Sequence, residues 1–125
     1  MADIVRSIGC IGCGNMGGAI MAGLAERTSY TLYGHNRTRE RLRPLVAKGV
    51  KAMADAASLV RGSDVIIMGL KPYLVEDALR RILPQLTRDK LVISIAAGVT
   101  LGALRDAVEG ICPVVRVMPN TPALV

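Results

Sequence analysis

The chain has 125 residues, the size of one domain, and is 51% hydrophobic with no Phe or Trp, so we expect an aliphatic core. No apolar run approaches the roughly 20 residues that span a bilayer, and the first six residues lack the apolar core of a secretory signal, so we expect a cytoplasmic protein without a membrane partner. The formal net charge is +6, but neither stacking aromatic residues nor a nucleic-acid motif accompany the basic residues, which favours a solvated helix face over a nucleic-acid partner.

Strand-like and helix-like segments alternate along the whole chain. The expected strands are short apolar runs at 6–11, 30–33, 50–53, 65–70, 91–95 and 113–118. The expected helices lie between them, at 15–26, 38–48, 56–61, 74–83 and 101–108. Asp55 and Thr100 are expected to cap two of these helices, and Pro84 to stop the fourth.

This order predicts the fold class and where a ligand binds. Nearly continuous apolar runs such as 65–70 are typical of strands buried on both faces of a parallel sheet. We therefore expect a single α/β domain with a Rossmann-type, doubly wound and mostly parallel sheet. Ligands of such sheets bind beyond the carboxyl ends of the strands. Five loops should converge there, at 12–17, 34–39, 69–72, 96–98 and 119–122.

A glycine-rich loop joins the first strand to the first helix, with the spacing Gly12-x-Gly14-x-x-Gly17. In dinucleotide-binding loops, the first glycine permits the tight turn, the second clears space for the pyrophosphate, and the third lets the helix pack closely. The helix N-terminus then offers N–H groups and a positive dipole end to the anion. A merely structural turn is the alternative. The candidate cofactor-binding residues are Gly12, Cys13, Gly14, Asn15, Met16 and Gly17.

Cys10 and Cys13 form a Cys-x-x-Cys pattern inside this segment. With His35 as the only histidine and no second cysteine pair, four zinc ligands cannot be assembled from Cys and His, so we expect no metal site. The spacing follows from the glycine pattern instead. Because a helix N-terminus lowers the pKa of a nearby thiol, sensitivity of Cys13 to oxidants is a side hypothesis.

The segment after the second strand bears on the choice of dinucleotide. NAD-binding domains carry an acidic residue there for the ribose 2′-hydroxyl, whereas residues 33–39 contain none. Asn36 and Thr38 can donate to a 2′-phosphate, and Arg37 or Arg39 can add a charge-assisted contact. We therefore predict NADPH in preference to NADH. Three later cations, Arg41, Arg43 and Lys48, are expected to face solvent. His35 is expected to lie beside the adenosine half of the cofactor.

Four segments together resemble one enzyme family. In chain order they are residues 8–17, 70–72, 94–100 and 115–122. They are similar to pyrroline-5-carboxylate reductase, the enzyme of the last step of proline biosynthesis, and the resemblance covers essentially the whole chain. It implies NADPH-dependent hydride transfer to the C=N bond of a small cyclic imine, 1-pyrroline-5-carboxylate, which gives L-proline.

Further cofactor-binding candidates follow from these segments, each with a structural alternative. Lys71 can meet the cofactor or be an ordinary surface lysine. Ala96 and Ala97 are small enough for the backbone to pack against the nicotinamide ribose, but a plain turn explains them equally. Asn120 can hold the nicotinamide carboxamide or line the imine site, yet between two prolines it can simply form a turn. The full set is Gly69, Leu70, Lys71, Pro72, Ile95, Ala96, Ala97 and Asn120.

The chain departs from the family at two places. Family members often carry an Asn near Ala56 that helps to hold the cofactor, so that contact is in doubt. They also continue past the last segment into a helical half that forms the homo-oligomer, completes the substrate pocket and assists proton delivery, and this chain ends at Val125. We therefore expect residues 1–125 to be an NAD(P)-binding domain that is inactive alone.

No catalytic residue is named from the sequence. Asp64, Glu76 and Asp77 are better explained as caps or solvated side chains than as a buried acid or base. Two other functions stay open: a non-catalytic dinucleotide-binding module, and an NADP-dependent dehydrogenase of another small substrate.

Overall fold

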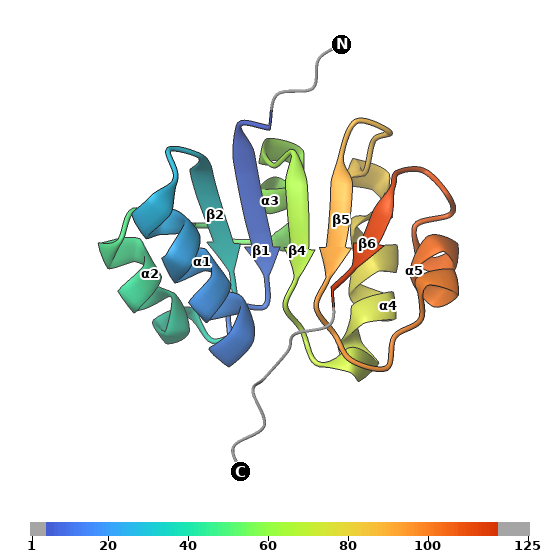
Figure 1. Cartoon of the computed structure of the whole chain (residues 1–125), viewed down its shortest axis with the longest axis horizontal. Coiled ribbons are helices and arrows are strands. Elements are labelled where there is room, and N and C mark those ends of the chain that lie inside the picture. Colours follow the sequence, from blue (N-terminus) through green and yellow to red (C-terminus); the bar gives the residue numbers. More distant parts are fainter. Residues whose placement is uncertain (1–4, 118–125) are drawn as a thin grey trace.

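The computed structural model describes residues 5–117. They form one sheet of six strands in the order β3-β2-β1-β4-β5-β6, and every pair of neighbours is parallel (Figure 1). The chain therefore runs outward from β1 in one direction, returns, and continues from β4 in the other. The strands are β1 Ser7–Ile11, β2 Thr31–His35, β3 Lys51–Ala52, β4 Val65–Met68, β5 Leu91–Ser94 and β6 Val114–Arg116.

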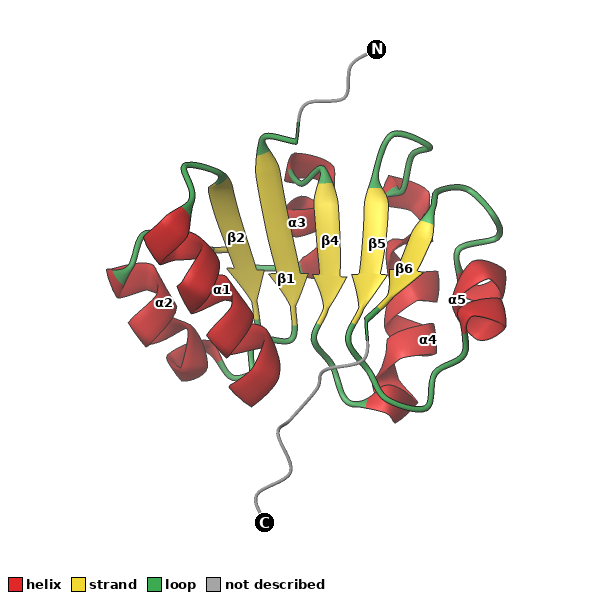
Figure 2. Ribbon diagram, viewed as in Figure 1, coloured by secondary structure: helices red, strands yellow, loops and turns green. Residues whose placement is uncertain are grey.

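Helices cover both faces of this sheet, as the doubly wound prediction requires (Figure 2). One face carries α1 and α2, and the other carries α3, α4 and α5 (Figure 1). The α-helices are α1 Asn15–Arg27, α2 Arg43–Ala47, α3 Ala56–Gly62, α4 Pro72–Ile82 and α5 Leu101–Ala107, and the 3₁₀ helices are η1 Arg39–Leu42 and η2 Leu83–Gln85.

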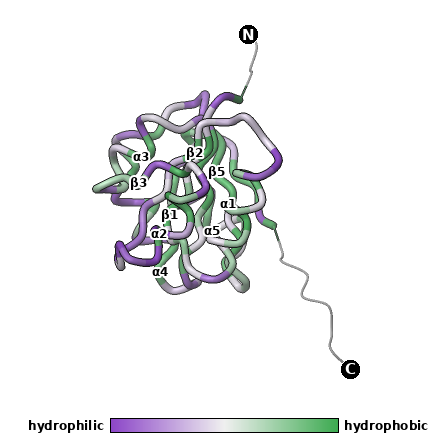
Figure 3. Tube along the Cα trace, turned by 90° about the vertical axis from the view of Figure 1, so that its left-hand side faces the viewer, coloured by the Kyte–Doolittle hydropathy of each residue, from purple (hydrophilic) through white to green (hydrophobic). Residues whose placement is uncertain are grey.

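The core is aliphatic and lies in two layers, one on each side of the sheet. Residues of β4 alternate between them: Val65 and Ile67 pack with α1 and α2, while Ile66 and Met68 pack with α3, α4 and α5. All four are buried, as predicted for a strand covered on both faces. Figure 3 shows the hydrophobic stretches along the strands inside the molecule and hydrophilic stretches in the outer loops. Among residues 5–117, no helix is long and apolar enough to cross a membrane.

Both predicted helix caps are present. The Asp55 Oδ1 atom accepts a hydrogen bond of 2.7 Å from the Ser58 N–H, and the Thr100 Oγ1 atom accepts one of 3.0 Å from the Ala103 N–H. Each side chain thus satisfies a donor that a helix leaves free at its first turn.

Several predicted boundaries were wrong. The helix expected at 38–48 is divided into η1 and α2, because Pro44 lacks the N–H that a continuous helix needs at that position. The strand expected to reach Leu70 ends at Met68, where the chain turns toward α4. That helix begins at Pro72, two residues earlier than expected. The last strand ends at Arg116, and Met118 lies outside the described residues.

Candidate functional site

The loop between β1 and α1 is built around glycines that other residues could not replace. Gly12 has a φ of +90°, a left-handed conformation that favours glycine, and an added Cβ would lie 2.7 Å from the Leu70 Cδ2 atom. A Cβ on Gly17 or on Gly69 would collide with the Gly12 carbonyl oxygen. The loop, the start of α1 and the end of β4 therefore touch backbone to backbone.

Gly14 stands at the same turn but has different surroundings. It is the N-cap of α1, and no side chain caps this helix. A Cβ on Gly14 would meet only one atom within 4 Å, the Arg41 Nη1 atom at 4.0 Å. The missing side chain thus leaves open space in front of a 13-residue helix whose first N–H groups lack partners within the helix.

The loop after β2 is tied to the glycine-rich loop by hydrogen bonds. The Gly12 N–H donates to the His35 carbonyl oxygen over 2.9 Å. The Cys13 N–H donates to the Asn36 Oδ1 atom over 3.0 Å, and the Asn36 Nδ2 atom donates to the Thr38 carbonyl oxygen over 2.9 Å. The side-chain oxygen and nitrogen of Asn36 therefore both bond to the protein backbone. The sequence had suggested that Asn36 donates to the cofactor.

A cavity of about 480 Å³ gathers three of the predicted loops at the carboxyl ends of β1, β2 and β4. This is the point where the strand order reverses direction, at which open α/β sheets bind their ligands. Its lining is Gly12, Gly14, Asn15, Asn36, Arg37, Thr38, Arg41, Gly69, Leu70, Lys71, Tyr73 and Leu74.

A second cavity of about 250 Å³ shares several of these residues and extends toward α3 and α4. Leu70, Leu74 and Ala78 give it apolar walls, and Ala56 also lines it. His35 also lines it, and the His35 Nδ1 atom lies 3.1 Å from the Met53 carbonyl oxygen. The two cavities together offer an apolar slot beside a basic, backbone-lined region.

Comparison with known proteins agrees with this geometry. Residues 7–98 match the family described as NADP oxidoreductase, coenzyme F420-dependent. The chain belongs to this family. It is also 40% identical over 124 residues to a pyrroline-5-carboxylate reductase of Methanosarcina acetivorans and 37% identical to that of Escherichia coli, covering 96% of this chain and 46% of each relative. The chain thus spans about half the length of the curated relatives it matches.

Two solved structures agree with the family in fold. A pyrroline-5-carboxylate reductase from Coxiella burnetii has a TM-score of 0.87 at 29% identity, over 95% of this chain and 46% of that one. A pyrroline carboxylate reductase from Plasmodium falciparum with NADP bound has a TM-score of 0.80 at 29% identity, over 96% and 44%. Family and fold together support a nicotinamide dinucleotide, NAD(P), as the ligand of the site.

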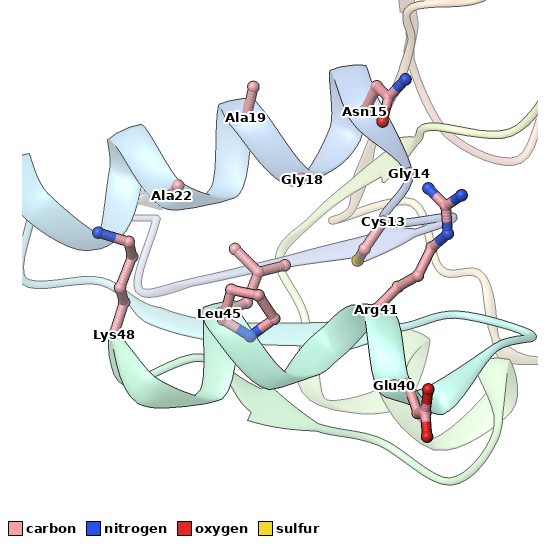
Figure 4. A pocket seen from close by; sticks show the side chains of 11 residues that line it. Cys13, Gly14, Asn15, Gly18, Ala19, Ala22, Glu40, Arg41, Leu45 and Lys48 are labelled. Atoms are coloured by element: carbon pink, nitrogen blue, oxygen red, sulfur yellow. The ribbon is translucent and has the colours of Figure 1, made fainter.

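Arg41 is a residue of the site that sequence reasoning assigned to solvent. It is exposed, as expected, but it also lines the 480 Å³ cavity and a groove of about 430 Å³ between α1 and α2. Figure 4 shows its side chain extending from η1 toward Gly14, whereas Lys48 lies at the far end of the groove.

Other predicted residues lie outside the two cavities. The Cys13 side chain and Gly17 are buried beneath the loop, Met16 is exposed on α1, and Pro72 begins α4. Ile95, Ala96 and Ala97 follow β5, one strand further along the sheet, and line neither cavity. Asn120 lies outside the described residues. Conversely, Tyr73 and Leu74 line the larger cavity without having been predicted; Tyr73, the second residue of α4, is 77% exposed.

Cys10 in β1 and Cys13 in the glycine-rich loop are buried free thiols. The hydrogen bond between them raises the pKa of Cys10 well above its usual value, with burial adding to the effect, and lowers the pKa of Cys13. The Cys10 Sγ atom also donates to the Gly12 carbonyl oxygen over 3.6 Å. Within residues 5–117, no three His, Cys, Asp or Glu side chains gather as a metal site would require.

Proposed function

We propose that residues 1–125 form the NAD(P)-binding domain of a pyrroline-5-carboxylate reductase, which reduces the C=N bond of 1-pyrroline-5-carboxylate to give L-proline. The observation that carries the proposal is the open side of Gly14 at the uncapped start of α1, inside a cavity lined by basic residues. The family and the names of the relatives supply the reaction.

The residues of the site fit a dinucleotide in three parts. The first N–H groups of α1 suit the pyrophosphate, which can approach because Gly14 has no Cβ. The apolar slot between Leu70, Leu74 and Ala78 suits the adenine ring. We assign the nicotinamide half to the loops after β4 and β5, which contain Lys71, Ala96 and Ala97, because these strands lie on the opposite side of β1 from β2.

We further propose that NADPH is preferred to NADH. No carboxylate occurs between Tyr33 and Arg39, so nothing there would repel a 2′-phosphate. Arg37 and Arg41 line the same cavity as Thr38, and guanidinium groups form strong charge-assisted hydrogen bonds with phosphate.

The bound cofactor would supply the hydride for imine reduction. The contribution of this chain is to hold and orient that donor and to provide one wall of the substrate site. Asn120, in the last of the family-like segments, is our candidate for a contact with the nicotinamide or the imine. We assign no proton donor to these residues, and we propose that the imine pocket and self-association involve a helical carboxyl-terminal part, as the resemblance implies.

Two glycines provide the test of cofactor binding: Gly14, the N-cap of α1, and Gly23 within that helix. Gly14→Ala places a methyl group in the open space proposed for the pyrophosphate, whereas Gly23→Ala adds one on the same helix with nothing within 4 Å. We expect Gly14→Ala to fold and to weaken NADPH binding about tenfold or more, measured by the fluorescence of the bound nicotinamide, because one lost anion contact costs at least about 1.5 kcal/mol. Gly23→Ala should bind like the unchanged chain. Equal binding by all three proteins would refute the site.

Reduction itself is tested by following NADPH oxidation with pyrroline-5-carboxylate. The chain is assayed alone and with the carboxyl-terminal part of a relative added as a second polypeptide. We expect turnover only in the mixture. NADPH binding without turnover in either assay would instead favour the non-catalytic module, and turnover with a different small substrate would favour another dehydrogenase.

A further inference from the structure

Asn36 links the two loops that carry the phosphate-binding groups of the proposed site. Its side chain accepts from the Cys13 N–H of the glycine-rich loop and donates to the Thr38 carbonyl oxygen of the basic loop. We infer that Asn36 is a positioning residue that sets the spacing between the pyrophosphate and 2′-phosphate subsites, instead of contacting the 2′-phosphate itself. This inference rests on the proposed function.

On the glycine-rich side, the hydrogen bond decides which backbone groups face a ligand. The Cys13 N–H points at the Asn36 Oδ1 atom over 3.0 Å, so this donor is used inside the protein. The Cys13 side chain is buried, and Cys13 is not among the residues that line the 480 Å³ cavity. Anion binding is therefore left to the N–H groups that follow Gly14 at the start of α1.

On the basic side, Asn36 fixes the backbone around Arg37. The Nδ2 atom of Asn36 reaches the Thr38 carbonyl oxygen over 2.9 Å and closes a small ring of main chain around the arginine between them. The same segment is anchored by the Gly12 N–H, which donates to the His35 carbonyl oxygen. Arg37 is itself exposed, so its placement depends on this backbone and not on the packing of its side chain.

The consequence concerns a ligand that must reach both loops at once. In NADP⁺ the covalent structure fixes how far the 2′-phosphate can lie from the pyrophosphate. A protein whose subsites already have that spacing binds both groups with little further loss of entropy. Without the Asn36 bonds, the two loops would have to be brought into position during binding.

Fragments of the cofactor test this inference. ADP carries the pyrophosphate alone, 2′-AMP carries the 2′-phosphate alone, and NADP⁺ carries both. For Asn36→Ala we expect each fragment to bind within about threefold of its affinity for the unchanged chain, while NADP⁺ loses about tenfold or more, because only NADP⁺ benefits from preset spacing. A direct contact of Asn36 with the phosphate would instead weaken 2′-AMP and NADP⁺ by the same factor and leave ADP unchanged. That result would overturn the inference, as would unaltered binding of all three ligands.

Thr28→Ala is the matched control. It also removes a side-chain to backbone hydrogen bond, from the Thr28 Oγ1 atom to the Leu24 carbonyl oxygen over 2.7 Å, but at the far end of α1. It should leave the affinities for all three ligands unchanged. If the unchanged chain binds neither ADP nor NADP⁺, the proposed function fails, and that outcome is distinct from a failure of the inference.

A second measurement needs no variant. Hydrogen exchange of the Cys13 amide, followed by NMR in the free chain, reports whether its N–H is already bonded. We expect protection before any ligand is added and little further protection with ADP. Rapid exchange in the free chain that slows only when ADP binds would show that this N–H is available to phosphate, and the inference would be wrong.

Discussion

The two ends of the parallel sheet use their polar groups in opposite ways. At the amino ends of the strands, polar groups satisfy one another: the Asp64 Oδ2 atom accepts from the Arg6 and Ser7 N–H groups, and the Ser7 Oγ atom donates to the Gly62 carbonyl oxygen. At the carboxyl ends, the start of α1 has no side-chain cap, and Arg37 and Arg41 line a cavity.

This difference separates stability from binding. Groups that are bonded to one another at the amino end are expected to contribute to folding and to leave the ligand unaffected. Groups that face the cavity at the carboxyl end are expected to contribute to binding at little benefit to folding. The variants below test this separation between folding and binding. It should fail at Gly17, and it does not cover Asn36, whose amide bonds to the backbone at the carboxyl end.

Gly17→Ala should have the largest effect, because it lies at the carboxyl end but inside the packed backbone. The new Cβ would collide with the Gly12 carbonyl oxygen, and a main-chain atom cannot turn aside as a side chain could. We expect a loss of about 3 kcal/mol or more in the free energy of unfolding, measured with urea, and loss of NADPH binding. Gly23→Ala in the same helix should be neutral or stabilising by up to about 1 kcal/mol. Similar unfolding midpoints for the two variants would contradict the packing argument.

Ser7→Ala tests the amino end. The buried Ser7 hydroxyl donates to the Gly62 carbonyl oxygen over 2.8 Å and accepts from the Asp64 N–H over 3.0 Å. Removing it leaves these partners with fewer bonds, so we expect a loss of about 1–3 kcal/mol in stability. NADPH affinity, measured under conditions in which both proteins are folded, should not change. Thr87→Ala, at an exposed position on the same end, serves as the control and should stay within about 0.5 kcal/mol of the unchanged chain.

Arg41→Ala tests the carboxyl end in a residue that does not support the fold. We expect about a tenfold loss of NADPH affinity, a smaller loss of NADH affinity and an unaltered melting temperature. The guanidinium lines the cavity with Thr38, where we propose the 2′-phosphate, and also lies near Gly14, where we propose the pyrophosphate that both cofactors carry. Arg43→Ala removes a neighbouring exposed cation that lines neither cavity and should bind both cofactors normally. An equal loss for NADPH and NADH would mean that Arg41 acts on the pyrophosphate instead.

The sequence predicted most of the fold because the deciding signals are local. The apolar run that forms β4, the glycine spacing and the Asp55 cap each depend on a few neighbouring residues. The division of the basic segment between Leu42 and Arg43 was equally local, because the missing N–H of Pro44 was a sufficient signal that the expected helix could not be continuous.

The roles of individual site residues depended on distant neighbours and were harder to predict. Asn36 binds an N–H that lies 23 residues earlier in the chain, so its use as a link between loops was not visible in the local pattern. The position of Arg41 could be predicted only by knowing the path of η1, which brings this exposed cation toward Gly14. Sequence reasoning therefore located the loops, whereas the structure showed how they hold one another.

Asp64→Asn should have the smallest effect, and we expect that effect to disappear at acid pH. The Arg6 N–H, together with that of Ser7, holds the pKa of the Asp64 carboxyl below its ordinary value. A carboxyl whose pKa is lower in the folded state stabilises the fold above the unfolded value of about 3.9, and this contribution is lost as the pH falls through the lower folded value. We therefore expect the variant to be less stable than the unchanged chain near neutral pH, by less than about 1 kcal/mol because the carboxylate contacts solvent.

The two proteins should then converge as the pH falls below about 4, since protonation removes from the unchanged chain what the substitution removed from the variant. Urea unfolding across this range measures the difference, and NADPH binding at neutral pH should be the same for both. A stability difference that does not vary with pH would mean that Asp64 acts through the shape of its side chain and not its charge. A change in NADPH affinity would break the separation between the two ends of the sheet, because Asp64 precedes β4 while the cavity lies beyond its carboxyl end.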